Sequence, residues 1–575
     1  MHEKPGSPGF SFLITHGVPA HHSATSLRPL LSLATVMAHE RYGIVNPWLV
    51  TVSVMLATFM EVLDTTVVNV SIPHISGNLS ATTDEGTWVV TSYLVSNAII
   101  LPMSGWLANY FGRRRMLMIS VAGFAATSFM CGLATSLESL IFYRILQGLT
   151  GGGMVPLAQS TMLESFPPEK HGHAMAAYSI GILLAPIIGP TLGGWITDSY
   201  TWRWIFWINV PVGILGVILI SAFVWDPPYL KRPKGKIDLP GMALLALGFG
   251  SLQIVLDTGQ KNDWLAADSI RIWTVLCVAG LGGMIIRELT CDHPIVDLRA
   301  LKNRTFAAGV FLMTIVAFCL YGSLLLLPIY MQTLLNYPAL EAGLALSPRG
   351  IGALACTPIV GMLAGKRDPR KILAFGLVVS GLTMLQLSHL NLNAGYWDVF
   401  WPQVLQGIGM SCTFIPLATS SVSLIPKPKM GNATAIFNLM RNIGGSFGVA
   451  LMTTLVARRN QFHQTRIGEH FTQWDSGTQT MLHQLQQFFM SRGSDAYTAS
   501  KQALGALYFS VQRQAAMLSF VEAFWVMCIV FWLVLPMVAV LKNPRKKDQV
   551  PQAPVRRSPE KPIPEHVEEP DLIPA

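Results

Sequence analysis

Residues 61 to 70 read EVLDTTVVNV and place two carboxylates, those of Glu61 and Asp64, inside the first long apolar stretch of the chain, residues 48 to 72. A carboxylate near the centre of a bilayer is strongly unfavourable, so an acid at such a position is first of all a candidate functional group. Glu61 and Asp64 are three residues apart and therefore project from one face of a helix. This face, which includes Thr65, is expected to line an interior cavity.

The composition of the whole chain is that of a membrane protein. Its 575 residues are 51% hydrophobic and only 12% charged, with a mean hydropathy of +0.45, whereas soluble domains contain about 25% charged residues. A helix that crosses about 30 Å of hydrocarbon needs roughly 20 apolar residues. Fourteen such windows predict an all-α polytopic membrane protein. They cover residues 48–72, 87–107, 115–134, 138–161, 173–196, 203–224, 239–259, 270–288, 306–335, 341–364, 372–388, 398–425, 432–456 and 519–541.

The distribution of Lys and Arg predicts the orientation. If the N-terminus is inside, the inner loops and the start of the C-terminal tail hold twenty-two basic residues, and the short outer loops hold three. Basic loops stay on the cytoplasmic side, so both termini are expected to face the cytoplasm. The net charge of +9 is spread over alternate loops rather than gathered in one patch, so no nucleic-acid partner is expected.

An internal repeat predicts two halves. Residues 105–117, GWLANYFGRRRML, align without gaps with residues 361–373, GMLAGKRDPRKIL, and the tripeptide Leu-Gln-Gly at 146–148 recurs at 405–407. Chance similarity among helices rich in Gly and Leu is the alternative. Duplication predicts two six-helix halves on either side of two extra central helices. The expected parts are residues 47–225, 226–304 and 305–543.

The remaining segments are polar. Residues 1–46 and 544–575 are expected to be disordered cytoplasmic tails, and Met37 is an alternative start to Met1. The outer segment 458–518 is rich in Gln and is expected to form a small helical structure. Its helical apolar spacing is carried by Met481, Leu485 and Phe488.

Asp64 is the first candidate for proton coupling. Because desolvation disfavours the charged form of an acid, Asp64 is expected to take up and release a proton as its cavity alternates between wet and dry. The alternative is a permanent ion pair or a helix cap, and Glu61 is the second candidate. Arg144, within the YRILQG run of the fourth predicted span, is an intramembrane cation that needs a partner or water. It either alters the protonation of a nearby acid between conformations or is a fixed anchor.

Arg349 and Arg441 are further basic residues in predicted spans, and each could either act on a nearby acid or be a fixed anchor, with weaker support than Arg144. For Arg349 the alternative is a side chain that extends to the outer interface. Apolar residues that line a cavity cannot be distinguished from core by sequence. The candidates for a substrate cavity are Met60, Thr65, Trp88, Tyr93, Gln147 and Arg441.

Two further motifs concern movement. Residues 181–194, GILLAPIIGPTLGG, combine small residues, which permit close helix approach, with prolines, which bend helices. They are expected to form a movable seam between the halves, with a simple packing kink as the alternative. The second motif is the inner loop at residues 105–115, GWLANYFGRRR. It is expected to pair with acids on neighbouring helix ends and so to hold one conformational state of the transporter closed, and its arginines are also expected to fix the topology. The motif residues are Gly181, Pro186, Gly189, Pro190, Gly193 and Gly194 in the span, and Gly105, Asn109, Gly112, Arg113 and Arg114 in the loop.

The sequence gives no support for an enzyme or an ATP-driven pump. It contains no Gly-x-x-x-x-Gly-Lys-Ser/Thr loop, no His-Glu-x-x-His and no clustered metal ligands. The seven cysteines lie in predicted spans or an inner loop, so neither a disulfide framework nor a metal pair is predicted. No cofactor or metal is expected.

In these motifs the chain resembles the fourteen-helix drug:proton antiporters of the major facilitator superfamily, and it is especially similar to EmrB-type exporters over residues 47 to 543. Residues 63–70 resemble the first-helix motif of that family, whose Asp, here Asp64, is implicated in proton coupling. Residues 144–148 match the arginine motif, residues 181–194 the antiporter motif, and residues 202–211, WRWIFWINVP, the start of the sixth helix. Two departures are Asn109, where the family has an acid, and the additional acid Glu61, which suggests a coupled pair.

The resemblance implies a major facilitator fold and a proton antiporter of the bacterial inner membrane that exports hydrophobic or amphipathic compounds by alternating access, driven by the proton motive force. It also implies a periplasmic adaptor of the membrane fusion type and an outer-membrane channel as partners. A dedicated metabolite or siderophore exporter of the same fold is the alternative, because a fold does not set the substrate. Resistance to many unrelated toxicants would favour the drug exporter.

Overall fold

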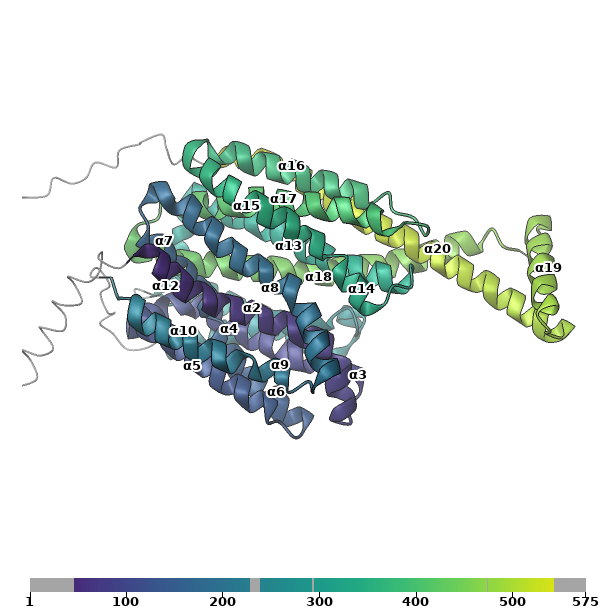
Figure 1. Cartoon of the computed structure of the whole chain (residues 1–575), viewed down its shortest axis with the longest axis horizontal. Helices are drawn as coiled ribbons and strands as arrows, with labels where there is room; N and C mark the ends of the chain where they lie inside the picture. Colours follow the sequence, from purple (N-terminus) through teal and green to yellow (C-terminus); the bar gives the residue numbers. More distant parts are fainter. Residues whose placement is uncertain (1–45, 228–237, 292–293, 473, 542–575) are drawn as a thin grey trace, which may run out of the picture.

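The chain is described by a computed structural model that covers residues 46–227, 238–291, 294–472 and 474–541. The predicted tails, 1–46 and 544–575, therefore lie almost entirely outside the described residues. The described part is helical, with long helices running side by side (Figure 1).

The first helix group begins with a capped helix and ends before residue 224. The side chain of Asn46 accepts a hydrogen bond from the backbone N–H of Trp48 at 3.0 Å, and Pro47 fits the first helical turn, where no partner for its nitrogen is needed. The group contains α2 (Pro47–Asn78), α3 (Thr83–Gly86), α4 (Trp88–Phe111), α5 (Arg113–Gly132), α6 (Leu137–Gly151), α7 (Met154–Ser165), a short 3-10 turn (Pro168–Lys170), α8 (His171–Ser199), α9 (Trp204–Trp207) and α10 (Asn209–Phe223).

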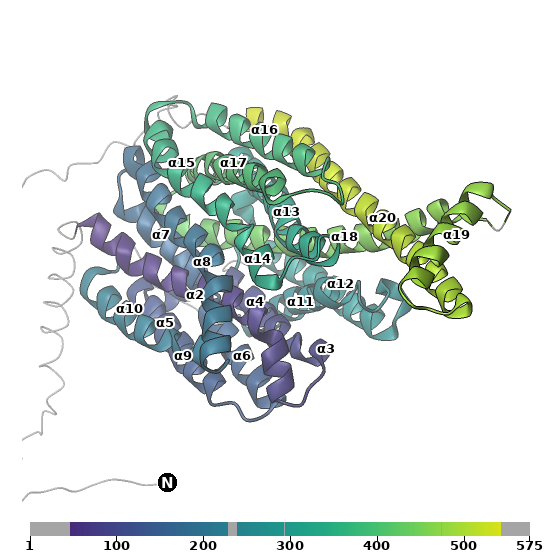
Figure 2. The same ribbon diagram turned by 45° about the vertical axis from the view of Figure 1, so that its right-hand side comes forward.

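Two linker helices follow and lie beside the boundary between the groups. They are α11 (Leu239–Thr258) and α12 (Asp268–Thr290). They pack closely, since a Cβ added at Gly248 would lie 2.8 Å from the backbone nitrogen of Leu281. Helix α11 also contacts α4 and α18, as Figure 2 shows.

The second helix group contains the remaining elements. They are α13 (Arg304–Thr333), α14 (Ala339–Leu344), α15 (Ser347–Lys366), α16 (Pro369–Leu387), α17 (Tyr396–Val422), α18 (Met430–Gly468), α19 (Ser476–Ser491) and α20 (Ala496–Leu533), with 3-10 turns at Lys427–Lys429 and Leu535–Val540. Two further 3-10 turns belong to the linker, Trp264–Ala266 between α11 and α12 and Leu298–Lys302 after α12.

Helical segments coincide with all fourteen predicted ranges, but not always as single straight helices. By length and composition, ten helices of the described chain suit a membrane crossing, or up to twelve if each bent pair is one span. The fourth predicted span is divided into α6 and α7, of 15 and 12 residues, each shorter than the roughly 20 residues of a crossing. Helices α17 and α18 meet at 118°. The number of crossings stays a prediction.

The predicted outer segment 458–518 is helical, and it is an extension of two spans rather than a separate unit. Helix α18 continues to Gly468, α20 begins at Ala496, and α19 joins them. The resulting hairpin projects from the bundle on the side opposite to the start of α2 (Figures 1 and 2).

The two helix groups meet closely near the end of the bundle at which α2 begins. A Cβ added at Gly105 of α4 would lie 2.7 Å from the carbonyl oxygen of Gly431 of α18, and one added at Gly361 of α15 would lie 2.6 Å from Cβ of Ala176 of α8. Further inside, Asn438 Nδ2 donates to Gln159 Oε1 at 2.6 Å. The absence of side chains at the glycines lets the backbones approach, so this end is closed.

Candidate functional site

Asp64 lies in the interior of the first helix group. Its side chain on α2 is 1% exposed, and its carboxylate accepts hydrogen bonds from three residues on two other helices. Arg144 Nη1 donates to Oδ2 at 2.6 Å, and Gln147 Nε2 and Asn209 Nδ2 donate to Oδ1 at 3.1 and 2.9 Å. The predicted interior position of Asp64 therefore agrees with the structure.

Arg144 is held by groups besides Asp64, although its Nη2 has no hydrogen-bond partner among the described residues. Its Nε donates to the carbonyl oxygen of Val89 at 3.0 Å and its Nη1 also donates to Gln147 Oε1 at 2.8 Å. The guanidinium carbon lies 4.3 Å from the ring centre of Tyr93, a distance at which the aromatic face attracts a cation. Both members of the ion pair are fully buried, so removing either one leaves an uncompensated charge.

Local structure explains how the donors converge. Ser136 and Ser139 form a capping box at the start of α6, and Arg144 and Gln147, three residues apart on that helix, present their side chains to the same side. Asn209 is the first residue of α10. It lies within the WRWIFWINVP run, whose sequence pattern assigned it no role. A polar residue inside the predicted apolar span 203–224 was the available signal.

Glu61 shares the helix of Asp64 but has its own surroundings. Its side chain is 6% exposed, and Oε1 accepts a hydrogen bond from Asn97 Nδ2 at 2.9 Å. In the described part of the chain Oε2 has no hydrogen-bond partner and Glu61 has no ion pair. Asp64 thus has an ion-paired carboxylate, whereas Glu61 has a buried carboxyl group beside the amide of Asn97.

The other cavity candidates are dispersed. Met60 and Tyr93 are buried, Trp88 is 41% exposed, and the Thr65 hydroxyl donates to the carbonyl oxygen of Val62 at 2.8 Å. The half-buried Arg441 has an Nε without a partner among the described residues. A substrate cavity around these residues stays a prediction.

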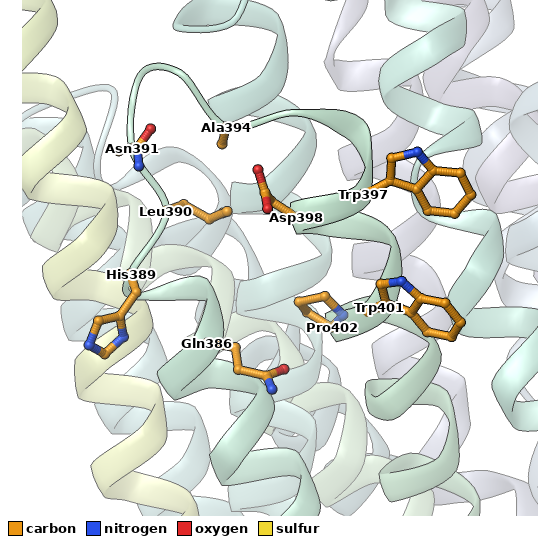
Figure 3. A pocket seen from close by; sticks show the side chains of 9 residues that line it. All are labelled: Gln386, His389, Leu390, Asn391, Ala394, Trp397, Asp398, Trp401 and Pro402. Carbon is orange, nitrogen blue, oxygen red and sulfur yellow. The ribbon is translucent and has the colours of Figure 1, made fainter.

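A hollow does occur elsewhere, at the loop between α16 and α17 (Figure 3). Polar groups of Asn391 and Asp398 face it, whereas the rings of Trp397 and Trp401 lie on the far side of α17 in this view. None of the predicted site residues lines it. Its lining is Gln386, His389, Leu390, Asn391, Ala394, Trp397, Asp398, Trp401 and Pro402.

The glycines of the antiporter motif pack against α2, within the first group, and the helix that carries them, α8, also contacts α14, α15 and α17 of the second group. A movable seam between the halves stays a prediction. Cβ atoms added at Gly181 and Gly193 would lie 2.6 Å from Met55 Cγ and 3.0 Å from the Val67 carbonyl oxygen, both on α2. Gly194 meets nothing within 4 Å. The first part of α8, up to Pro186, and its last part, from Thr191, are bent by 41°.

The direction in which the glycines face explains their contact with α2. Gly181, Gly189 and Gly193 follow the side of α8 that packs on α2, and Thr66 of α2 is the neighbour of Gly189. Contact of α8 with the second group includes Ala176, which lies before the motif and faces Gly361 of α15, and α8 also contacts α14 and α17. The motif thus brings α8 against the helix that carries Asp64.

The loop motif pairs with acids, as predicted. Gly112 has a φ of +91°, which few residues other than glycine adopt, and it lets α5 begin directly after α4. The buried Arg113 forms an ion pair with Glu164. The backbone N–H of Arg114 donates to Asp226 Oδ1 at 2.9 Å. Glu164 lies near the end of α7, Asp226 follows α10, and Asn109 of α4 is half-buried.

Comparisons with known proteins agree with this architecture. The family model of the Major Facilitator Superfamily matches residues 54–449. The multidrug export protein EmrB of Haemophilus influenzae is 39% identical over 498 residues, covering 85% of this chain and 96% of that protein. EmrB of Escherichia coli K12 is 36% identical, covering 86% and 95%. The fatty acid resistance protein FarB of Neisseria gonorrhoeae is 36% identical, covering 86% and 96%.

Solved structures show the same fold at low sequence identity. The proton:xylose symporter XylE superposes with a TM-score of 0.54 at 14% identity, covering 86% of this chain and 99% of that one. The human organic anion transporter MFSD10 gives 0.54 at 11% identity, covering 84% and 99%. The chain is therefore a polytopic membrane transporter rather than an enzyme, and it belongs to the EmrB-type branch of the major facilitator superfamily.

Proposed function

We propose that this transporter exports hydrophobic or amphipathic drugs and toxic compounds in exchange for protons by alternating access. The observation that carries the proposal is the buried carboxylate of Asp64, held by Arg144, Gln147 and Asn209 inside the first helix group. The multidrug export proteins among its relatives support the same function.

The site can couple a proton to a change of shape. The ionised carboxylate neutralises Arg144 and binds α2 to α6 and α10. Protonation removes the negative charge and with it most of the attraction, because hydrogen bonds to a charged group are roughly twice as strong as neutral ones. The helices then separate more easily, and the proton is released when the cavity opens to the other side. Glu61, one turn away, is the proposed second proton carrier.

The remaining proposals concern location and partners. We place the protein in the inner membrane of a bacterium with both termini in the cytoplasm, following the distribution of basic residues. The hairpin of α18, α19 and α20 then lies in the periplasm, where we propose that it binds a periplasmic adaptor that leads to an outer-membrane channel. Large exposed side chains on the hairpin, such as Trp474 at 90% exposed, support a binding surface.

Proton flux in liposomes tests the proposal. Purified protein is reconstituted with a pH-sensitive dye inside the vesicles, and an amphipathic cation is added outside. Wild type is expected to move protons on addition of substrate, and Asp64→Asn is expected to show only background flux while its melting profile stays cooperative. Asp198→Asn, which alters an exposed acid of the same helix group, is the control. Flux by Asp64→Asn equal to that of wild type would refute the proton site.

A further inference from the structure

The second helix group contains a buried polar cluster that the proposed mechanism does not use. Arg349 of α15 is 6% exposed, and Gln403 and Gln406 of α17 are 0% and 1% exposed. Arg349 Nε donates to Gln403 Oε1 at 2.9 Å. Among the described residues Nη1 and Nη2 of Arg349, Nε2 of Gln403 and Oε1 of Gln406 have no hydrogen-bond partner. Arg349 thus does not extend to an exposed interface, the alternative that its position near a helix end allowed.

The internal repeat makes this cluster the counterpart of the Asp64 site. The alignment of residues 105–117 with 361–373 places Arg349 at the position of Tyr93, and the Leu-Gln-Gly repeat places Gln406 at the position of Gln147. The same register places Gln403 at the position of Arg144.

The packing of the two Gly residues confirms this register. A Cβ added at Gly148 would lie 2.5 Å from the carbonyl oxygen of Tyr93. In the second group the nearest atom to a Cβ added at the equivalent Gly407 is the carbonyl oxygen of Arg349. Within each group, therefore, the two helices of the pair approach each other at equivalent residues, α4 and α6 in the first group and α15 and α17 in the second.

The two sites differ in where the guanidinium originates and in what neutralises it. In the first group the guanidinium of Arg144 lies over Tyr93 and is neutralised by Asp64 of α2. In the second group the guanidinium comes from Arg349, the counterpart of Tyr93. The helix equivalent to α2 is α13, the first of its group, and Arg304–Thr333 contains no Asp or Glu. The second site thus has a buried guanidinium beside an amide, as the first site has, without a carboxylate on the helix equivalent to α2.

Chemistry restricts what this site can accept. Arginine stays protonated in proteins, and a buried cation without a partner is strongly unfavourable. No carboxylate of the described chain forms an ion pair with Arg349. Its two Nη atoms form a planar fork that matches the two oxygens of a carboxylate, and Gln403 Nε2 supplies one more donor. A monovalent oxygen anion fits these groups and a cation does not.

We propose that Arg349 and Gln403 form a subsite that binds the carboxylate of an amphipathic anionic substrate, as the counterpart of the site that holds the Asp64 carboxylate. This proposal rests on the proposed export function and specifies one of its substrate classes. The phosphate of an anionic lipid shares the same charge and oxygen acceptors, and the experiment separates it from a substrate.

Direct binding tests the subsite independently of proton coupling. Radiolabelled decanoate, and the matched cation decyltrimethylammonium, are bound to the purified full chain in detergent and measured by scintillation proximity. Arg349→Gln is expected to weaken decanoate binding at least about tenfold, the loss typical of a hydrogen bond to a charged group, and to leave binding of the cation within about twofold. Arg349→Lys, which keeps the charge and loses the fork, is expected to be intermediate.

A second variant supplies the missing carboxylate. Gln403→Glu places an acid at the oxygen that accepts from Arg349 Nε at 2.9 Å, and it is expected to abolish decanoate binding and raise the melting temperature, because the new ion pair satisfies the guanidinium. This variant carries the test if Arg349→Gln does not fold. Wild-type decanoate affinity in both variants would overturn the proposal.

Two controls separate a substrate from a lipid headgroup and the subsite from the proton site. Addition of phosphatidylglycerol or phosphatidylcholine in mixed micelles identifies the anion: displacement of decanoate by phosphatidylglycerol alone assigns the site to a lipid headgroup and overturns the substrate assignment. Asp198→Asn, which alters an exposed acid of the first group, is expected to bind decanoate like wild type. If Asp64→Asn retained proton flux in liposomes, the export mechanism would fail while the decanoate result for the Arg349 variants still decided the subsite.

Discussion

Asp64 and Arg144 are 80 residues apart in the sequence and meet at 2.6 Å in the interior of the first helix group. Each is recognisable from sequence as an intramembrane charge that needs a partner, because the unfavourable burial of a charge is visible in any apolar window. Their pairing could not be predicted, since the contact depends on how α2 and α6 pack. The role of Asn209 was missed as well, because its amide resembles many other polar groups at helix ends.

The amide of Asn209 offers the sharpest test of this network. It donates to Asp64 Oδ1 at 2.9 Å and stabilises the ionised carboxylate. In Asn209→Ala the protonated form is favoured, so the pH midpoint of transport is expected to rise by about 0.5 to 1 unit, the equivalent of one lost hydrogen bond. Measuring initial rates of substrate-driven proton flux across pH 5 to 9 checks the direction of the shift.

A control on the same helix as Asp64 distinguishes this effect from a general disturbance. Asn69→Ala removes an exposed amide of α2 and is expected to leave the pH profile of transport unchanged. A rate that falls equally at every pH in Asn209→Ala would contradict the proposed role and indicate a purely structural one.

At the scale of elements, hydropathy predicted where helices occur better than where they end. The apolar windows locate α2, α4 and α5 because both the lipid and the protein core require apolar side chains along the whole span. They could not show that α18 and α20 continue outward as helices, since residues 458–518 are polar and a polar helix has no apolar stripe of the usual width. The motif 181–194 was correctly expected to pack closely, but small residues do not reveal which neighbour they face.

The side chain of Asp238 connects the linker helices α11 and α12, and the stability that it adds can be tested by lowering the pH. Asp238 caps α11 by accepting from the backbone N–H of Gly241 at 3.1 Å and pairs with Arg287 of α12 at 2.6 Å. The hydrogen bond from Arg287 is the main reason why the pKa of Asp238 lies below its usual value of 3.8. The stability that this carboxylate adds is therefore present at neutral pH and is lost as the pH falls through that lowered pKa.

Two substitutions separate the cap from the ion pair. Asp238→Ala removes both and is expected to lower the free energy of unfolding by about 1 kcal/mol at pH 7. Asp238→Asn keeps a capping oxygen and is expected to lose less. Thermal unfolding in detergent at pH 7 and at successively lower pH is the measurement. A difference between wild type and Asp238→Ala that grew on acidification would contradict the assignment.

The closed end of the bundle depends on backbone contact between α4 and α18. Gly105→Val places atoms where the carbonyl of Gly431 now lies, and overpacking of this kind costs about 1 to 3 kcal/mol. The variant is expected to favour the conformation in which this end is open, seen as faster hydrogen exchange at the start of α18. Gly282→Val, at a position where a Cβ would meet no described atom within 4 Å, is the control. Unchanged exchange in Gly105→Val would show that this contact does not hold the end closed.

In the molecule as a whole, the hairpin allows transport across the membrane to be tested separately from the transfer of substrate to an adaptor. Tyr508 and Phe509 on α20 are 62% and 65% exposed, far from Asp64. If an adaptor binds there, replacing both by Ser is expected to reduce drug resistance of intact cells at least about tenfold, as hot-spot aromatics do, and to leave proton flux in liposomes unchanged. Both assays are run on the same variant.

Trp397, at the start of α17, provides the matched control because it is 64% exposed and belongs to another part of the surface. Trp397→Ser is expected to change neither resistance nor flux. Equal loss of resistance and of liposome flux in the hairpin variant would place these aromatics in transport itself and remove the support for an adaptor.

The length of α18 has a mechanical consequence. Its 39 residues extend about 58 Å at 1.5 Å per residue, nearly twice the hydrocarbon thickness, and its inner part touches the first helix group through Asn438. A rigid rod of that length works as a lever, since tilting it by about 10° at the inner end swings its tip by roughly 10 Å. Each transport cycle would thus displace the outer end of α18 far enough to change its contacts with a protein bound there.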